Sequence, residues 1–259
     1  MIWLVKIPET LFVLAIPLFI LSASVAWAVN DEGLYQQGFD DYRISTRTGI
    51  SQVDLRAVGA DIRRYFNSSE ESLRVRARVY GVERELFTAQ EVTHMRDVKV
   101  LVQKVYLVMQ VAGAFLVAGI IGGIIWYRSS SPDKLALLFQ WGAWLTLALV
   151  TSVGLLALTG FDALFLRFHQ LSFSNDFWQL DPRTDYLIIL FPQGFWFDAT
   201  MRVGLTAVTA ALGLIGVSVV LMAFRWWFGP NRSYWRRSGN PELLQPDAPD
   251  TPSYNDPWR

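Results

Sequence analysis

The sequence predicts a mainly helical membrane protein with four transmembrane helices. We expect a small extracytoplasmic α+β domain between spans one and two, and an aromatic interfacial loop between spans three and four. Only 18% of the residues are charged and 52% are hydrophobic. Four apolar runs without a charge are each long enough to cross a hydrocarbon core of about 30 Å, which takes about 20 helical residues. Because backbone amides in lipid need partners within their own segment, these runs should be helices.

The composition excludes several classes of protein. The 23 basic and 23 acidic side chains balance, so no field favours nucleic acid. The absence of cysteine removes disulfides, thiolate nucleophiles, iron–sulfur clusters and zinc–thiolate sites. No Gly-x-Ser-x-Gly, phosphate-loop or His-Glu-x-x-His motif is present, which argues against standard serine hydrolase, nucleotide and zincin chemistry. Acid–base chemistry near neutral pH therefore falls first on His94 and His169.

The first predicted segment, residues 1–29, holds the run from residue 11 to residue 29. Ala26, Trp27 and Ala28 also satisfy the small-x-small rule of a signal-peptide cleavage site. A retained span is favoured over a cleaved signal, because the run is longer than the usual apolar region of about 7 to 15 residues.

The predicted extracytoplasmic domain, residues 30–104, begins with helical signals. Ser51 followed by Asp54 suits a helix N-terminus. The apolar residues after them recur at helical spacing: Leu55, Val58, Ile62 and Phe66. We therefore expect one short amphipathic helix.

Alternation with a period of two follows from Leu73 to Val79, which predicts a strand with one wet face. Gly81 then turns the chain into a second strand through Phe87. Thr88 and Glu91 have the spacing of a capping box, which opens a helix that runs into the second span.

The second and third spans are expected at residues 105–127 and 135–159, with small residues from Gly113 to Gly123 that permit close helix contact. The fourth span, residues 203–224, is followed by arginines before any acid. Arginine and lysine also dominate the turn between spans two and three, so both termini should lie in the cytoplasm. The tail, residues 229–259, is rich in proline and predicted to be disordered.

The loop at residues 160–202 is crowded with aromatic side chains, which favour the membrane–water interface. They are Phe161, Phe165, Phe168, Phe173, Phe177, Trp178, Tyr186, Phe191, Phe195, Trp196 and Phe197. Asp181 and Pro182 mark a turn. The apolar run from Leu187 to Phe191 is too short to span and is expected to lie flat or re-enter. The segment is interpreted as a cradle at the outer leaflet.

His94 shares a helix face with Glu91 and Asp97, at spacings of three residues. Either carboxylate would fix the tautomer of the imidazole and raise its basicity. The alternative is ordinary: Glu91 caps the helix, Asp97 pairs with Arg96 or Lys99, and His94 is solvated.

His169 stands among Phe165, Phe168 and Phe173, where burial would keep the imidazole neutral and basic. The alternative is an interfacial histidine bonded to a backbone carbonyl.

Polar residues in the same loop are supporting candidates. Asn175 would donate to an oxyanion or cap a helix, and Asp176 and Trp178 lie beside it. Tyr35 offers a phenol to a polar site or simply packs. A zinc held by two histidines and a carboxylate is a minor alternative, and no metal or cofactor is predicted.

Two stretches resemble the bacterial lipoprotein intramolecular transacylases: "LFTAQEVTHMRDVKVL" and "FLRFHQLSFSNDFWQLDPRTDYLIILFP". The resemblance runs from the first span through the fourth, and it implies a location in the bacterial cell (inner) membrane. It implies movement of the sn-2 acyl chain of a diacylglyceryl group to the α-amino group of a lipoprotein's N-terminal cysteine, which gives a lyso-form lipoprotein. The partners it implies are diacylglyceryl-modified bacterial lipoproteins and membrane lipid, and the family's functional histidines correspond to His94 and His169.

An ammonium group must lose a proton before it attacks an ester, and an imidazole is a suitable base. Our hypothesis makes His169 that base, while His94, oriented by Glu91 or Asp97, stabilises the oxyanion or protonates the departing oxygen; the reverse assignment is open. Because His94 precedes Val105 by about 16 Å of helix, either the apolar core starts nearer Val98, with Lys99 and Lys104 snorkelling, or the helix tilts or bends. A non-catalytic scaffold that docks lipoproteins and a phospholipid hydrolase are the competing functions.

Overall fold

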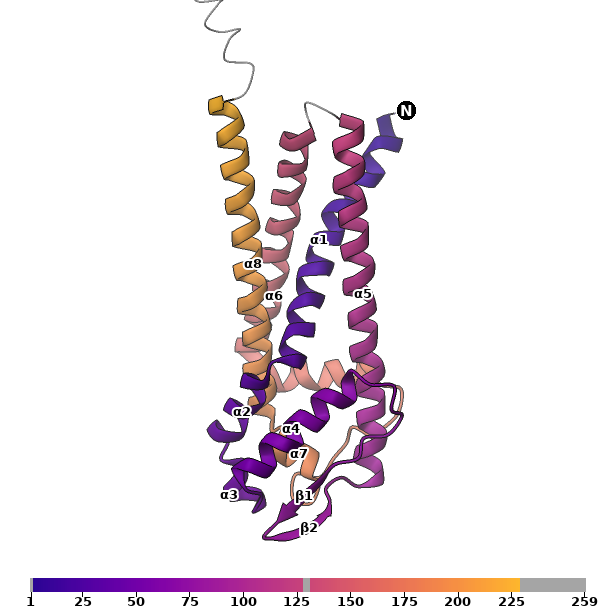
Figure 1. The fold of residues 1–259 in the computed structure, drawn as a ribbon, viewed down its shortest axis with the longest axis vertical. Coiled ribbons are helices and arrows are strands. Elements are labelled where there is room, and N and C mark those ends of the chain that lie inside the picture. The colour runs from indigo at the N-terminus through magenta and orange to yellow at the C-terminus, as the bar shows by residue number, and fades with distance from the viewer. Residues whose placement is uncertain (1, 128–130, 229–259) are drawn as a thin grey trace, which may run out of the picture.

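The computed structural model describes residues 2–127 and 131–228. Within them, four helices are long and apolar enough to cross a membrane, which confirms the predicted mainly helical architecture. They run side by side in Figure 1: α1 (Ile2–Asn30), α5 (Ala89–Tyr127), α6 (Ser131–Ser172) and α8 (Gln193–Phe228). The tail at residues 229–259 lies outside the described residues, so its disorder stays a prediction.

Helix α1 packs against α5, α6 and α8. Its side chains Ile16 and Phe12 are almost fully buried. Glycines on the neighbouring helices make this approach possible. A Cβ atom at Gly142 of α6 would lie 2.6 Å from Cβ of Ile16, and one at Gly119 of α5 would lie 2.6 Å from Cδ2 of Phe12. The small residues predicted to permit close helix contact therefore serve contacts within this chain.

Helix α6 bends sharply at Gly160, where the backbone has φ −174° and ψ 62°. The predicted third span ended one residue earlier. Beyond the bend the helix continues through residues 161–172, which we call the terminal segment of α6. Figure 1 shows this segment running crosswise to the four long helices, at the foot of the bundle. The first part of the predicted interfacial loop is thus helical.

Between α1 and α5 lie three shorter helices, α2 (Glu32–Asp41), α3 (Ile44–Thr48) and α4 (Gln52–Phe66). Helix α4 is the predicted amphipathic helix. The hydroxyl of Ser51 accepts from the backbone N–H of Asp54, and the predicted apolar positions are buried. Both the N-terminus and the buried face are confirmed.

A hairpin follows α4, with antiparallel strands β1 (Arg76–Val79) and β2 (Val82–Glu85). Tyr80 and Gly81 form its two-residue turn, with φ values of 49° and 82°. Positive φ at both central positions is typical of a type I′ turn, in which glycine is favoured. The turn lies where it was predicted, although the strands are shorter than the alternation suggested.

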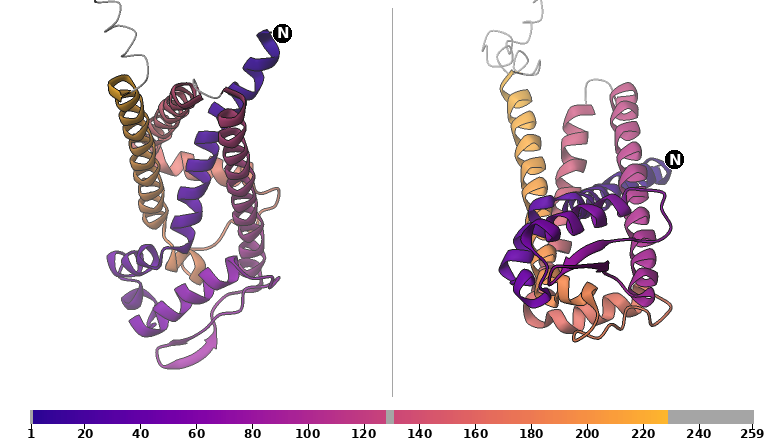
Figure 2. Two further views of the ribbon diagram at one scale, coloured as in Figure 1. Left: turned by 45° about the horizontal axis from the view of Figure 1, so that its top comes forward. Right: turned by 60° about the horizontal axis from the view of Figure 1, so that its bottom comes forward.

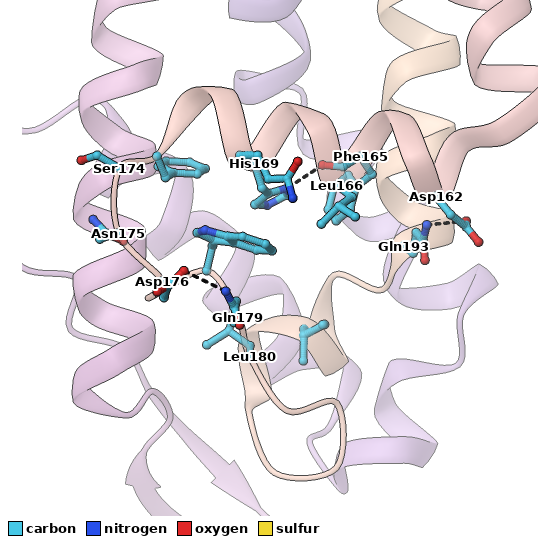
Figure 3. Close-up of a pocket in the computed structure, with 14 residues that line it drawn as sticks. Asp162, Phe165, Leu166, His169, Ser174, Asn175, Asp176, Gln179, Leu180 and Gln193 are labelled. Atoms are coloured by element: carbon cyan, nitrogen blue, oxygen red, sulfur yellow. Dashed lines mark hydrogen bonds between the residues drawn. The ribbon is translucent and has the colours of Figure 1, made fainter.

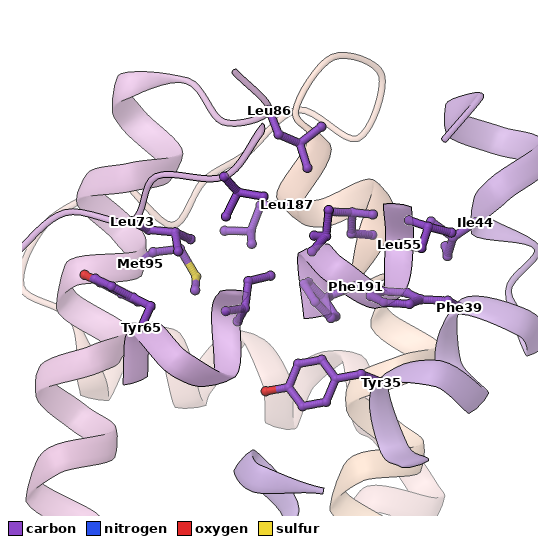
Figure 4. Packing of buried hydrophobic residues seen from close by; sticks show 14 of the residues in the cluster. Tyr35, Phe39, Ile44, Leu55, Tyr65, Leu73, Leu86, Met95, Leu187 and Phe191 are labelled. Carbon is purple, nitrogen blue, oxygen red and sulfur yellow. The ribbon is translucent and has the colours of Figure 1, made fainter. Parts of the chain in front are cut away.

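The outer segments share one hydrophobic core. Helix α7 (Tyr186–Leu190), from the loop between α6 and α8, contributes Leu187 and Leu190 to a cluster that also holds Phe39, Leu55 and Leu86. Figure 4 shows α7 side chains packed among those of the segment between α1 and α5. The expectation that this short run lies flat or re-enters the membrane is wrong, because its apolar side chains are buried inside the protein.

All of these outer elements gather at one end of the bundle. Figure 1 shows α2, α4, the hairpin, α7 and the terminal segment of α6 together at the end opposite the start of α1, and Figure 2 shows the same elements from two further sides.

Candidate active site

The two histidines of the chain come together. His94 lies in the second turn of α5, His169 lies on the terminal segment of α6, and their ring centroids are 6.1 Å apart. The capping box sets the start of α5 as predicted. The backbone N–H of Thr88 donates to Glu91 Oε2 over 2.6 Å, and that of Glu91 donates to Thr88 Oγ1 over 3.3 Å.

Both histidines lie outside the apolar parts of their helices. The candidate span in α5 runs from Ala89 to Ile125 and has 37 residues, about 56 Å of helix. This length exceeds a hydrocarbon core of about 30 Å. Its first turns carry the charged residues Glu91, Arg96, Asp97, Lys99 and Lys104. His94 therefore precedes the apolar part of α5, and His169 follows the bend that ends the apolar part of α6.

His169 is enclosed by aromatic rings and is only 9% exposed. The centroids of Phe165 and Trp178 lie 4.4 and 5.2 Å from its own. Its Nδ1 lies 2.8 Å from the backbone carbonyl oxygen of Phe165. Since a carbonyl only accepts, Nδ1 carries the hydrogen and Nε2 keeps a free lone pair. Burial lowers the pKa of His169 below its ordinary value, although the bond to Phe165 opposes this.

His94 is buried as well, so the solvated alternative is wrong. Its ring lies 5.1 Å from that of Phe173, edge to face. Burial, and then the neighbouring His169, lower the pKa of His94 to about 4, against an opposing effect of Asp97. His94 is therefore neutral at pH 7. Within the described part of the chain its Nδ1 is buried without a hydrogen-bond partner.

The carboxylates that were expected to orient His94 are bound elsewhere. Glu91 is fully buried, and its second oxygen, Oε1, accepts from the backbone N–H of Leu187 over 2.6 Å. Asp97 accepts from the side-chain amide of Asn175 over 2.8 Å. Neither forms a hydrogen bond with His94 among the described contacts. Asp97 acts on His94 only through its charge. The expectation that Glu91 or Asp97 orients the imidazole of His94 by a hydrogen bond is therefore wrong.

The basic neighbours of Asp97 also differ from expectation. Arg96 pairs with Glu71 over 2.6 Å. Lys99 is buried, with its ammonium donating to the carbonyl of Glu70 over 2.6 Å and lying 4.2 Å from the ring centroid of Tyr65. Lys99 thus binds the outer segment and does not snorkel.

A cavity of about 780 Å³ opens beneath the terminal segment of α6, with His169 on its wall (Figure 3). Its lining includes two carboxylates, Asp162 and Asp176, and no lysine or arginine. The other lining residues are Phe165, Leu166, Gln170, Phe173, Ser174, Asn175, Trp178, Gln179, Leu180, Ile188 and Gln193.

The supporting candidates are divided by this geometry. Asn175, Asp176 and Trp178 line the cavity, whereas Tyr35 does not. The hydroxyl of Tyr35 donates to the carbonyl of Val29, and burial raises the pKa of this phenol. Tyr35 is therefore a packing residue of the outer core.

Sequence reasoning missed Asp162 and Gln193, whose side chains bond to each other at one end of the cavity. Asp162 precedes His169 by two helical turns and shares its face, a spacing that was visible in the sequence. Gln193 carried no such signal, because it comes from α8. No three histidine, aspartate or glutamate side chains gather as a metal site in residues 2–127 and 131–228.

A family model described as lipoprotein intramolecular transacylase Lit matches residues 10–196. The chain belongs to this family. The matched region of the transacylase family contains α1 from residue 10 onward, both histidines and all the residues that line the cavity, and it ends in the first turn of α8.

Other known proteins are also similar to this family member. A protein of Aquifex aeolicus (strain VF5), described as uncharacterized, is 31% identical over 125 residues, which cover 46% of this chain. The matched region spans 50% of the length of that relative.

The fold resembles the in meso structure of the membrane-integral lipoprotein intramolecular transacylase Lit from Bacillus cereus. The TM-score is 0.71 at 18% identity, over 86% of this chain and 97% of the other. Two structures of the same protein with one histidine replaced, by arginine or by alanine, match with TM-scores of 0.70. At this identity the likeness establishes the fold.

Proposed function

We propose that this protein is an intramolecular acyltransferase of bacterial lipoproteins. It moves the sn-2 acyl chain of the diacylglyceryl group to the α-amino group of the N-terminal cysteine of the same lipoprotein. The product carries an amide-linked acyl chain and a free sn-2 hydroxyl. Membership of the transacylase family supports this reaction.

The observation that carries the proposal is a pair of buried, neutral histidines, of which His169 lines the cavity and His94, which is not among the lining residues, has its ring centroid 6.1 Å from that of His169. The hydrogen bond to Phe165 leaves Nε2 of His169 as a proton acceptor. We assign His169 as the base that removes a proton from the substrate's α-ammonium group. The amine then attacks the carbonyl carbon of the sn-2 ester.

His94 takes the complementary role. Because it is neutral at pH 7, one of its ring nitrogens carries a hydrogen. Its Nδ1 has no hydrogen-bond partner among the described residues, and we assign this ring, beside His169, to the oxyanion of the tetrahedral intermediate. When the intermediate collapses, the C–O bond to glycerol breaks and the new C–N bond remains. The amine nitrogen gives up its second proton, and the departing oxygen is protonated, so the overall reaction releases one proton.

The charge of the cavity suits this substrate. Its lining holds the carboxylates Asp162 and Asp176 and no lysine or arginine, and the negative field of two carboxylates attracts an ammonium group. Leu166 and Phe168 on the terminal segment of α6 are about half exposed, and Leu171 is 87% exposed. These side chains would enter the outer leaflet, so that the acyl chains stay in lipid while the ester reaches His169.

We place both termini in the cytoplasm, and the outer elements with the cavity on the extracytoplasmic side of the bacterial cell membrane. Basic residues after α8 support this orientation. Lipoproteins with a diacylglyceryl group are exposed on that side, where they could reach the cavity along the membrane surface.

The test expresses the chain in a bacterium whose lipoproteins are diacylated. Mass spectrometry of N-terminal lipopeptides then compares wild type, His94→Ala, His169→Ala and Thr93→Ala. Thr93 adjoins His94, but its hydroxyl bonds to the carbonyl of Ala89 and it does not line the cavity.

We expect lyso-form lipopeptides with wild type and Thr93→Ala. Loss of a general base typically costs about 10² to 10⁴ in rate, so both histidine variants should leave lipoproteins diacylated. Unchanged lipopeptides with wild type, or full conversion by both histidine variants, would refute the proposal. Free fatty acid without N-acylation would identify a hydrolase instead.

A further inference from the structure

The loop at residues 173–180 forms one wall of the cavity and belongs to no helix or strand. It carries Phe173 and Trp178, whose ring centroids lie 5.7 and 5.2 Å from that of His169. These rings make up part of the dry surroundings of the base. Backbone hydrogen bonds join Phe173 to His169 and Leu180 to Trp178. Side-chain contacts from α5 add to these bonds and set where the loop lies against that helix.

Asn175, which lies between Phe173 and Trp178 in the sequence, supplies such a contact with α5. Its Nδ2 donates to Asp97 Oδ2 on α5 over 2.8 Å. Its Oδ1 accepts from the backbone N–H of Phe177 over 3.1 Å and so shapes the turn that leads to Trp178. The side chains of Asn175 and Asp97 are both partly buried. A hydrogen bond to a carboxylate is roughly twice as strong as one between neutral groups. One amide thus shapes the loop and fastens it to α5.

A second contact acts on the far end of the same loop. Gln90 Nε2 donates to the carbonyl of Gln179 over 3.0 Å. Gln90 and Asp97 are seven residues apart, two helical turns, so they lie on one face of α5. His94 lies between them on that helix. The face that presents His94 to His169 is therefore also the face that binds the loop.

We propose that Asp97 and Asn175 are positioning residues, whose hydrogen bond holds Phe173 and Trp178 against His169. The inference rests on the proposed function for its chemistry. Asp97 has no described hydrogen bond to His94, and it acts on His169 through Asn175 and the loop. The pair thereby maintains the enclosed site in which the substrate's ammonium group meets the base.

The test exchanges the two side chains. Asn175→Asp places two carboxylates face to face, whereas the double variant Asp97→Asn with Asn175→Asp restores an amide–carboxylate pair in the opposite direction. Arg96→Gln is the control, because it breaks a surface ion pair on the same helix that faces away from the loop. Activity is measured as kcat/KM for a synthetic diacylglyceryl lipopeptide in detergent.

The second readout is independent of activity. Diethyl pyrocarbonate modifies accessible neutral imidazoles, and peptide mass spectrometry gives its rate at His169 alone. Displacement of the loop would expose this ring, which is 9% exposed in the folded protein.

We expect Asn175→Asp to lower kcat/KM by about 10²-fold, since a misplacement of about 1 Å has that effect, and to speed modification of His169. The double variant should return both quantities to within about threefold of wild type, because the coupled residues compensate each other. Arg96→Gln should change neither. If Asn175→Asp fails to accumulate, Asp97→Asn alone should shift both readouts in the same direction.

The inference would be overturned if kcat/KM of the double variant were no higher than that of Asn175→Asp. It would also be overturned if the rate of diethyl pyrocarbonate modification at His169 were unchanged in both single variants. If wild type lacked transacylase activity while the modification rates followed the expected pattern, the proposed function would fail and the positioning role would stand.

Discussion

Burial decides the chemistry of His169. A substrate α-amino group has an ordinary pKa of about 7.7 to 8.0, so at neutral pH most of it is ammonium and a base is required. The aromatic rings around His169 lower the pKa of its imidazole, and the carbonyl of Phe165 holds the hydrogen on Nδ1. The neutral form therefore persists at a pH where a free histidine would be protonated.

The pH profile follows from these pKa values. When a neutral base meets an ammonium substrate, both forms are present from about pH 7.5 down to the lowered pKa of His169. We expect kcat/KM to be flat over that range and to fall only below about pH 6.5, the ordinary histidine value. Initial rates on a synthetic lipopeptide measure this.

Attack by free amine without a base would give a different profile. The rate would then fall tenfold for each pH unit from about pH 7.5 downward, which would contradict the assignment of His169.

The stability of the folded protein should also decrease as the pH falls. Both histidines have folded-state pKa values below the unfolded value of about 6.5, so their contribution is complete above that pH and is lost as the pH falls.

The sequence indicated which residues could do the chemistry but not all of their partners. His94 and His169 were found because imidazoles are rare here and each lies beside a span. The orientation of His94 was predicted wrongly, since spacing puts Glu91 and Asp97 on its face but says nothing of competing donors. The donors that bind them, Leu187 and Asn175, are 96 and 78 positions away.

Between elements, Glu91 joins two helices. Its carboxylate is fully buried and accepts from backbone N–H groups of Thr88, at the start of α5, and Leu187, in the first turn of α7. One side chain thus satisfies donors that neither helix can satisfy internally.

Removing this carboxylate should cost more than a surface change. Glu91→Ala leaves two N–H groups without their partner, and each buried unsatisfied donor costs about 1 to 3 kcal/mol, so we expect a loss of about 2 to 6 kcal/mol. The thermal unfolding midpoint of the purified protein in detergent should fall accordingly.

Glu71→Ala is the matched control. Glu71 is an exposed carboxylate paired with Arg96, and such pairs contribute about 0 to 1 kcal/mol. Equal midpoints for Glu71→Ala and Glu91→Ala would show that the buried bonds of Glu91 do not stabilise the fold.

Local signals predicted some elements well because their causes are local. Helix α4 and the hairpin depend on a cap, an apolar period and a turn glycine, all within a few residues. Helix α7 was misplaced for the opposite reason. A short apolar run can lie at a membrane surface or in a protein core. Only its packing against distant residues such as Leu55 and Leu86 shows that this run belongs to the core.

At the scale of the whole molecule, orientation can be tested on a clean background, because the chain has no cysteine. Val82→Cys would place a thiol on the hairpin and Phe228→Cys one at the end of α8, at positions 67% and 68% exposed. In intact spheroplasts we expect a membrane-impermeant maleimide to label Val82→Cys only.

Permeabilised cells serve as the control, in which both variants should be labelled. Labelling of Phe228→Cys in intact spheroplasts would reverse the proposed orientation and place the cavity in the cytoplasm.

Length and composition were enough to predict four spans, because the hydrocarbon core fixes how many apolar residues a helix needs. Their arrangement was not predictable, since lipid-facing and protein-facing residues are equally apolar in such helices. The cavity also escaped prediction, because it forms only when α6 bends at Gly160 and brings His169 beneath the bundle.

The central position of α1 has a consequence for biosynthesis. The ribosome makes this helix first, yet its partners α5, α6 and α8 arrive in turn, and α8 is the last. Until α5 and α6 are made, the surfaces around Phe12 and Ile16 lack the helices that pack against them, and the surface of α1 that contacts α8 stays uncovered longest. The bundle is therefore completed only when α8 packs against α1, the helix of the four that is made before the others. A chain that stops before α8 leaves α1 without one of its three neighbours.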